Sequence, residues 1–512
     1  MDTVSMASAD FVFRPPPGLG SKRASAASAV FTLVSTIVGG GSLSLPFAFA
    51  KLGLAEAAGL LIVIAVASDL GASLLVSAAR RSGGCTYEQV AYKAYGRPAQ
   101  LVTVVLLVVL TYLCCVAYII LMGDFAVPLL EVYVVRGTNL SGLGRALAMG
   151  GAMVLVSPLC FLRKLTALRF TSAMSMTSML FLTCVIVAKA VIHARSVGLA
   201  TMWRPVAYTS SFADTLYGFP LISVAFLVHF NVLPVHTELT ATEPALQRIR
   251  NVIHVTVGIC STLYVVIGVA GYATFGTAVD GDVLKNYGRD DHLVNAGRFA
   301  LLATLLCNFP LLCIPCRISL DRLVLLARDA WCLPAPHGQS IAGHLTPPEK
   351  QPLLAQPDVN SGEGGEPSRW ALAREDPRDA LKLAGTPDTS RWDDEHPPSP
   401  ESVMVERLRV VERAARDKYA RLRQSIETVL IIASSLAFAI AVPSVVIVWS
   451  FMGSTISMLI AFVLPALYYL KIRAARSTNP RRVAAVGLLC FGMIMLVACT
   501  YQSVRTTVEQ ES

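Results

Sequence analysis

Long apolar runs alternate with short polar segments along most of this chain. Eleven runs approach the length of about 20 residues that an α-helix needs to cross a bilayer. The pattern predicts an all-α polytopic membrane protein with eleven transmembrane helices, numbered here as spans 1 to 11. The expected spans are residues 28–50, 55–79, 99–122, 146–162, 170–192, 214–233, 252–274, 296–316, 426–448, 451–470 and 483–502.

The same pattern divides the chain into segments. Residues 1–27 are expected to be a disordered cytoplasmic N-terminus, and residues 28–328 to hold spans 1–8. Residues 329–425 form a cytoplasmic insert, residues 426–502 hold spans 9–11, and residues 503–512 form a short non-cytoplasmic tail.

Span 1 is interrupted in its middle by Gly39-Gly40-Gly41-Ser42, with Pro46 a few residues later. A helix broken at mid-depth is tolerated only where its freed backbone faces protein or a water-filled cavity. Broken helices that bind a solute at their ends are typical of secondary transporters. Close helix packing is the alternative for a single glycine. Three glycines with a serine and a proline favour a break that forms a site.

Composition and charge agree with a membrane protein and orient it. Hydrophobic residues make up 54% of the chain and charged residues 15%, against about 25% charged in soluble domains. Lys and Arg are concentrated in alternate loops, which places the N-terminus in the cytoplasm and the C-terminus on the other side. The sequon at Asn139, after span 3, then lies on the non-cytoplasmic side, where glycosylation occurs. The net charge of +9 reflects this topology and gives no sign of nucleic-acid binding.

The insert between spans 8 and 9 has a different composition. Twelve prolines lie between Pro334 and Pro400, which predicts disorder over residues 333–400. Glu401–Gln424 has the pattern of a basic amphipathic helix, suited to an anionic lipid surface or a calmodulin-like partner, or else extends span 9. Glu349–Leu354 resembles an acidic dileucine signal, so a sorting adaptor is a candidate partner.

Seven segments carry further motifs in order across residues 28–325. They are the broken span 1, Cys85–Pro98, Ala117–Leu130, Pro158–Met176, Val224–Leu239, Tyr264–Gly276 and Asn308–Arg317. Together they resemble the amino acid/auxin permease family, nearest to its sodium-coupled neutral amino acid transporter branch. Spans 9–11 resemble the spans of this family only in their general character, and the long insert is not a family feature.

The resemblance implies a LeuT-like architecture, in which two inverted repeats of five spans are followed by one extra helix. Span 6 is then the counterpart of span 1. It carries Pro220, the polar segment His229–Asn231, and Pro234. Paired interruptions in corresponding spans indicate a binding site near the bilayer midplane.

A free amino acid presents a carboxylate and an ammonium to such a site. Backbone amides after the glycines suit the carboxylate, because a half-helix N-terminus is electropositive. Carbonyls near Val38–Gly40 and near Ser223–Phe226 suit the ammonium. The predicted substrate-binding residues of span 1 are Val38, Gly39, Gly40, Gly41 and Ser42.

Spans 3 and 6 complete the predicted substrate site. Ser223 lies at the bend of span 6, and by analogy Phe226 covers the substrate. Tyr112 or Tyr118 of span 3 reaches the carboxylate, with ordinary helix packing as the alternative for each aromatic residue. No ionised residue lies near the expected centre on spans 1, 6 or 8, which favours neutral amino acids.

The resemblance also implies a coupling ion. Family sodium ligands, a span 1 asparagine and a span 8 hydroxyl, fall here on Ser35 and Asn308. Thr32, Thr36 and Thr304 are nearby oxygen donors, and hard cations accept such ligands. These departures leave both Na+ and H+ open as the coupling ion. No metal site or other cofactor is expected.

Two residues are candidates for proton chemistry. Asp69 lies in the middle of span 2, where an isolated charge is expensive and usually functional. A hydrogen-bonded packing role is the alternative. His229, at the end of span 6, has a side chain that titrates near neutral pH and is assigned to a cytoplasmic gate.

The sequence therefore predicts a secondary active transporter of small neutral amino acids that works by alternating access. The alternative is a membrane amino acid sensor that signals through the insert. An enzyme is not expected, because the spans carry no HExxH motif, no paired intramembrane aspartates and no nucleophile–base set. The plasma membrane and an endolysosomal or vacuolar membrane are both open as locations.

Overall fold

The computed structural model describes residues 25–136, 140, 142–161, 169–198, 211–239, 245–332, 422–473 and 480–511. Several predictions from sequence fall outside the described residues. They are the disorder of most of 1–27 and of 333–400, most of the amphipathic helix at 401–424, the sequon at Asn139, and the dileucine-like segment.

The described part of the chain holds eleven candidate membrane spans, as the apolar runs predict, when the bent pair of helices in span 1 is counted as one span. Ten helices are long and apolar enough to cross a bilayer, and Ala26–Ile37 with Gly40–Leu52 forms one further span that bends by 51°. The described residues contain no β-strand. The expected all-α polytopic fold is therefore confirmed.

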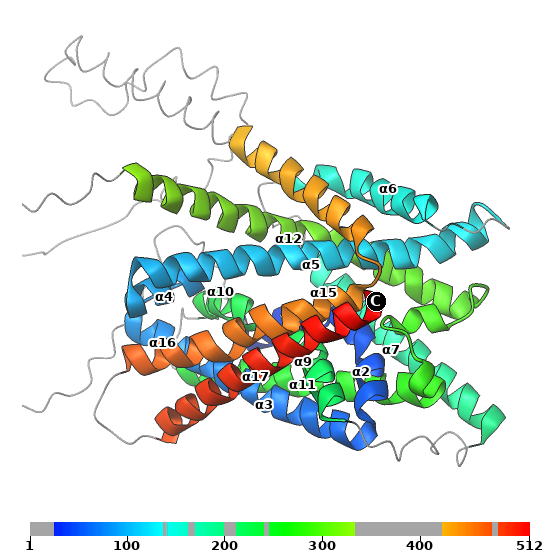
Figure 1. The fold of residues 1–512 in the computed structure, drawn as a ribbon, viewed down its shortest axis with the longest axis horizontal. Coiled ribbons are helices and arrows are strands. Elements are labelled where there is room, and N and C mark those ends of the chain that lie inside the picture. Colours follow the sequence, from blue (N-terminus) through cyan, green and yellow to red (C-terminus); the bar gives the residue numbers. More distant parts are fainter. Residues whose placement is uncertain are drawn as a thin grey trace, which may run out of the picture. The chain divides into compact units, whose positions relative to one another are not determined.

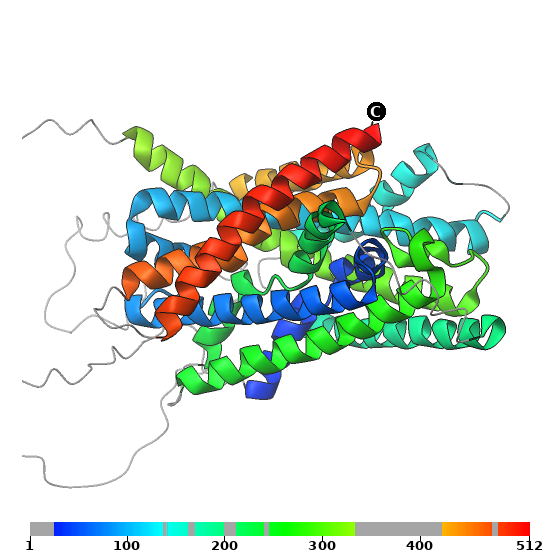
Figure 2. The ribbon, with the colours of Figure 1, turned by 60° about the horizontal axis from the view of Figure 1, so that its bottom comes forward.

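The long helices run side by side in two views of the molecule (Figures 1 and 2). In chain order the elements are α1 (Ala26–Ile37), η1 (Gly40–Ser44), α2 (Leu45–Leu52), α3 (Leu54–Ser82), α4 (Tyr87–Tyr95), α5 (Arg97–Tyr133), α6 (Leu143–Cys160), α7 (Arg169–Val197), α9 (Phe212–Ala225), α10 (His229–Leu239), α11 (Ala245–Phe275), η4 (Gly276–Ala278), η5 (Val283–Asn286), α12 (His292–Cys332), the helix Leu422–Ala441, α15 (Val445–Phe451), η7 (Met452–Ser457), η8 (Leu459–Val463), α16 (Leu464–Ile472) and α17 (Pro480–Glu511).

Helix boundaries follow local sequence signals. Ser25 caps α1 by accepting a hydrogen bond from the Ser28 amide, and Ser211 with Asp214 forms a capping box at the start of α9. Gly53, between α2 and α3, has a φ of 78°, which a residue with a Cβ adopts only with strain. This glycine lets the chain reverse direction between spans 1 and 2.

Spans 6 and 10 are the most enclosed of the spans described. In span 6, formed by α9 and α10, 83% of the most apolar 18-residue stretch is buried. In span 10 (Val445–Ile472) the buried share of the corresponding stretch is 78%. The same figure is 22% for α6 and for the last helix. Span 10 includes the π-helical segments η7 and η8, a backbone form that is rare and frequently found at functional sites. The centre of the bundle is therefore built from spans that depart from regular α-helix.

Candidate functional site

The helix of span 1 stops at the glycines. α1 ends at Ile37, and Gly39 is extended, with φ −136° and ψ −156°. The carbonyl oxygen of Gly39 accepts hydrogen bonds from the backbone N–H of Ser42 at 3.1 Å and from the Ser42 hydroxyl at 2.7 Å. The short 3₁₀ turn η1 then leads into α2. The interruption that the glycines predict is thus present.

Span 6 is broken as well. α9 ends at Ala225, residues 226–228 are not helical, and α10 begins at His229. The break lies slightly later than the Ser223–Phe226 bend expected from sequence. Broken spans at positions 1 and 6 stand five spans apart, as two repeats of five spans require.

The two breaks lie against each other and share one hydrogen-bond donor. A Cβ on Gly41 would be 3.8 Å from the Cα of Ala225. The hydroxyl of Tyr264, on α11, lies 2.9 Å from the carbonyl oxygen of Ile37 and 2.7 Å from that of Ala225. This side chain is fully buried, and its ring packs edge-on against Phe226 at 5.2 Å between centroids. Tyr264 therefore ties the end of α1 to the end of α9.

A second hydroxyl supports the break in span 6. Ser68, on α3, donates a hydrogen bond of 2.8 Å to the carbonyl oxygen of Phe226. Two carbonyls in succession, those of Ala225 and Phe226, thus accept hydroxyl donors from two different helices. The Phe226 carbonyl also accepts the backbone N–H of Val228 at 2.9 Å, so the Ser68 hydroxyl is its second donor. A buried carbonyl left without any partner costs about 1–3 kcal/mol.

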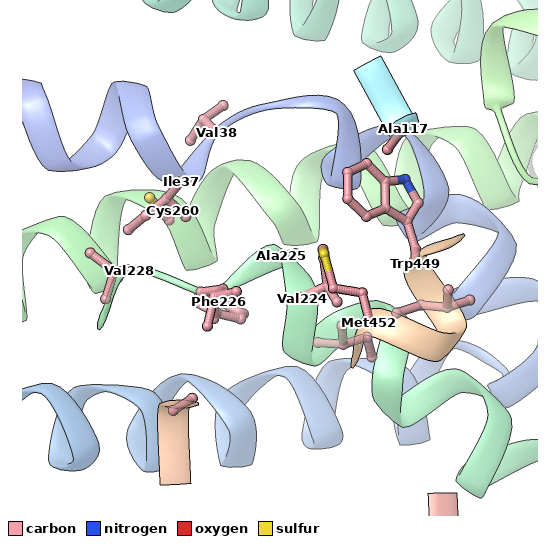
Figure 3. Close-up of a cluster of buried hydrophobic side chains, with 14 of the residues drawn as sticks. Ile37, Val38, Ala117, Val224, Ala225, Phe226, Val228, Cys260, Trp449 and Met452 are labelled. Carbon is pink, nitrogen blue, oxygen red and sulfur yellow. The ribbon is translucent and has the colours of Figure 1, made fainter. Parts of the chain in front are cut away.

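Side chains from spans 3 and 10 enclose the breaks. A Cβ on Gly39 would lie 3.4 Å from the Tyr118 hydroxyl, and one on Gly40 would lie 3.6 Å from the Trp449 indole and overlap Leu121. A larger residue at Gly40 would require the Leu121 side chain to shift, whereas a Cβ at Gly39 would make an ordinary contact. Figure 3 shows the apolar side chains that gather along both broken helices and beside them: Ile37, Val38, Val224, Ala225, Phe226, Val228, Trp449 and Met452.

Three buried polar groups beside the breaks have no hydrogen-bond partner among the described residues. They are the hydroxyls of Ser44 and Ser223 and the indole Nε1–H of Trp449, in residues that are 1%, 1% and 4% exposed. Buried polar groups are normally paired, so unpaired ones indicate strain or an absent partner. Spans 1, 6 and 10 thus each carry one buried polar group without a partner among the described residues.

Of the two span 3 tyrosines considered from sequence, Tyr118 is the one placed beside the glycines. Tyr112 precedes it on α5 by six residues, a rotation of about 240° around the helix. The two side chains therefore point in different directions, and Tyr112 faces another side of α5.

Several residues at the breaks were not predicted from the sequence. They are Tyr264, Ser68, Trp449 and also Gly453, where a Cβ would overlap the carbonyl oxygen of Pro220 in span 6. Each is a common residue type within an apolar run, so the sequence carries no local signal for its role. The clearest available signal was the serine and glycine content of Met452–Ser457, which forms the π-helical η7.

The candidate ion ligands fall into two groups. On α1, the hydroxyls of Thr32, Ser35 and Thr36 donate to carbonyls of their own helix, at Ser28 and Thr32. Among the described hydrogen bonds, none joins this group to span 8.

The span 8 candidates contact span 5 instead. The Thr304 hydroxyl is 2.9 Å from that of Ser178, and the Asn308 amide donates to Ser175 at 2.6 Å. The side-chain oxygen of Asn308 is buried and has no partner among the described residues. It is thus the one oxygen of the predicted ion set that the structure leaves unpaired and shielded from solvent.

Asp69 has a partner that the sequence did not suggest. Its carboxylate lies 2.6 Å from Nδ1 of His254 on α11. His229 is fully buried, and neither ring nitrogen has a hydrogen-bond partner among the described residues. Its Nε2 lies 2.9 Å from the position that a Cβ on Gly71 would occupy. Asp69 of α3 is thus paired with His254, whereas His229 of α10 lies against α3 without a hydrogen-bond partner among the described residues.

The loop between spans 7 and 8 is fixed to span 3 by buried charges. Asp124 of α5, with a side chain 3% exposed, pairs with Arg145 of α6 at 3.1 Å and with Lys285 of η5 at 2.9 Å. In the same loop the carboxylate of Asp282 accepts a hydrogen bond of 3.0 Å from the Leu284 amide. Burial, and then the nearby Asp124 carboxylate, raise the pKa of Asp282 to about 7.

Two discontinuous helices that meet inside an eleven-span bundle define a class of membrane transport protein in which the solute site lies between helix breaks. The family model for "Transmembrane amino acid transporter protein" matches residues 22–505, and the chain belongs to this family. The family consists of membrane transporters rather than enzymes, as the sequence predicts.

Curated relatives include transporters from animals and plants. The chain is 28% identical over 292 residues to "Putative sodium-coupled neutral amino acid transporter 11" of Danio rerio, a match to 56% of this chain and 63% of that protein. It is 27% identical over 270 residues to "Amino acid transporter AVT6E" of Arabidopsis thaliana, covering 51% and 54%. The matched region thus spans less than two thirds of each relative.

A solved structure titled "Crystal structure of MhsT in complex with L-phenylalanine" aligns with 93% of this chain and with all of that chain. The sequence identity is 12% and the TM-score is 0.47.

Proposed function

We propose that this protein is a secondary active transporter of small neutral amino acids that works by alternating access and is coupled to Na+ or H+. The observation that carries the proposal is the meeting of two helix breaks at Tyr264, with three unpaired buried polar groups beside them. Paired breaks of this kind hold a solute at the midplane in many secondary transporters.

The proposed site gives each part of a zwitterion a partner. The amides of Gly40 and Gly41 begin a helical turn and suit the carboxylate, with the Tyr118 hydroxyl and the Trp449 indole as further donors. The hydroxyls of Ser44 and Ser223 suit the ammonium, together with carbonyls of the segment Val38–Ser42. No charged side chain is needed, because a zwitterion carries both charges itself.

Phe226 and apolar residues of span 10 would enclose the substrate side chain. Phe226 is 1% exposed, and Met452 of η7 is also 1% exposed. Such walls favour small apolar or amide side chains over ionised ones, because burying an unpaired charge is costly.

For the coupling ion, the proposed Na+ ligands are the side-chain oxygen of Asn308, the Thr304 hydroxyl and the α1 residues Thr32, Ser35 and Thr36. The relative in Danio rerio is named as sodium-coupled, so Na+ remains one of the two candidate coupling ions. Protonation at Asp69 is the competing route, with His229 proposed to act in the gate. We further propose that the N-terminus is cytoplasmic, so that the loop between spans 7 and 8 closes the outer side.

The test is uptake of labelled L-alanine, L-glutamine, L-arginine and L-glutamate into proteoliposomes that contain the full chain. Gradients of Na+ and of pH are imposed separately, with choline replacing Na+. Accumulation of alanine or glutamine under either gradient supports the proposal. Binding of these solutes without flux would overturn it in favour of a sensor, and preferred uptake of arginine or glutamate would overturn the neutral substrate class.

A further inference from the structure

An ionisable pair within the membrane-spanning part joins two helices of the bundle. Asp69 lies near the middle of α3, and His254 lies on α11. The Asp69 carboxylate is 2.6 Å from Nδ1 of His254, and the two side chains are 20% and 46% exposed. Ionisable residues within membrane spans are rare and usually mark a pathway for ions or protons.

Few other charges act on this pair. Arg250, one turn before His254 on α11, is the other charged group that acts on Asp69. From α10, His229 approaches α3 at Gly71. Among the described contacts, His254 pairs with no charged side chain of α1 or α7, which also pack against α11. The protonation state of the pair therefore depends on its two members and on Arg250.

The pair is connected to the helix breaks through its neighbours on both helices. Ser68 directly precedes Asp69 and donates to the carbonyl oxygen of Phe226. Tyr264 lies ten residues after His254 on α11 and reaches the carbonyl oxygen of Ala225. The helices that Asp69 and His254 join are thus the ones that hold successive carbonyls of the broken span 6.

We propose that Asp69 and His254 form the proton-binding site that couples transport to a proton gradient. The inference rests on the transport function proposed above and identifies its coupling ion. With one proton bound, the pair consists of a carboxylate and an imidazolium and has no net charge. When the pair releases that proton, a net charge of −1 remains on it, and Arg250 is then the positive charge that acts on Asp69.

Loss of the proton therefore weakens the attraction between α3 and α11. A shift between these helices moves Ser68 relative to Tyr264, and so changes how the Phe226 and Ala225 carbonyls are held. By this route, binding of the proton changes the affinity for the substrate. Binding of the substrate then changes the affinity for the proton by the same factor, because coupling between two sites is reciprocal.

The experiment uses the full chain in proteoliposomes with a trapped pH-sensitive dye and labelled L-alanine and L-glutamine. It compares the wild type with Asp69→Asn and His254→Gln, and His193→Gln on α7 is the matched control. We expect the wild type and the control to move protons with substrate and to accumulate it under a pH gradient without Na+. Both test variants should lose this accumulation and the pH dependence of uptake, but retain exchange of labelled for unlabelled substrate.

The possible outcomes separate the two proposals. If the wild type accumulates substrate under a Na+ gradient and moves no protons, the proposed proton site is wrong, while the proposed transport function is supported. If His254→Gln still accumulates substrate under a pH gradient as the wild type does, the proton site is wrong as well. If the wild type neither exchanges nor accumulates these substrates, the transport function fails, and the proton site fails with it. Retained exchange shows that a variant is folded.

Discussion

The hydroxyl of Tyr264 lies 2.7 Å from the carbonyl oxygen of Ala225, the last residue of α9, and also reaches the end of α1. A tyrosine hydroxyl has one hydrogen to donate. Two carbonyls, one from each broken helix, therefore compete for it. A movement that separates the two breaks would leave the hydroxyl donating to one carbonyl alone, so Tyr264 is placed to respond to the state of both helices.

Replacement of Tyr264 by phenylalanine should slow transport while the fold persists. The change removes only the hydroxyl and leaves buried carbonyls with one donor fewer, at a cost of about 1–3 kcal/mol. We expect a lower thermal unfolding midpoint and a reduced maximal uptake rate in proteoliposomes. Tyr501→Phe, at an exposed site on α17, is the control and should change neither. Uptake by Tyr264→Phe equal to the wild type would show that the hydroxyl serves packing alone.

Much of the fold could be predicted from the sequence because its signals are local. Each span is a run of apolar residues, and the break in span 1 follows from its glycines. The break in span 6 was expected at Ser223–Phe226 and lies at residues 226–228, because α9 continues through Pro220 to Ala225. Proline within a membrane helix is tolerated where neighbouring groups satisfy the freed carbonyl, so it marks the break less sharply than glycine does.

The partners of the site residues could not be predicted, because they are distant along the chain. Asp69 and His254 are 185 residues apart, and Ser68 and Phe226 are 158 apart. A lone serine or tyrosine in an apolar helix looks like ordinary packing. Only the folded arrangement of α3 and α11 around span 6 shows which hydroxyls support the breaks.

The close contact between spans 6 and 10 predicts a severe effect of Gly453→Ala. The added methyl group would overlap the carbonyl oxygen of Pro220, which is backbone and cannot rotate away. Overpacking of this kind costs about 1–3 kcal/mol or more. We expect a marked fall in the thermal unfolding midpoint and in the yield of folded protein. Gly487→Ala, with open space around it on α17, should be tolerated. Equal behaviour of the two variants would contradict this packing.

Replacement of Trp449 by phenylalanine should weaken substrate binding. The indole Nε1–H is buried without a partner among the described residues, so its loss costs the folded protein little. If it donates to the substrate carboxylate, the loss is about 1.5–3 kcal/mol, or roughly 10- to 150-fold in KM. Uptake kinetics measure this change. Phe49→Leu on α2 is the control, because it shortens a fully buried aromatic side chain and removes no donor. A similar rise in KM for both variants would assign the effect to packing.

The buried carboxyl of Asp282 should make stability depend on pH. Burial, followed by the neighbouring Asp124, raises its pKa from 3.8 to about 7. Between these values the folded protein holds a proton that the unfolded chain has lost, so the free energy of unfolding falls as pH rises through this window. We expect the thermal unfolding midpoint of the wild type to fall, relative to that of Asp282→Asn, between about pH 4 and about pH 7, and to level off above. Asn cannot ionise, so the variant lacks this contribution.

Asp290→Asn, at an exposed position in the same loop, should follow the wild type at every pH. Parallel curves for the wild type and Asp282→Asn would show that this carboxyl stays ionised in the folded protein.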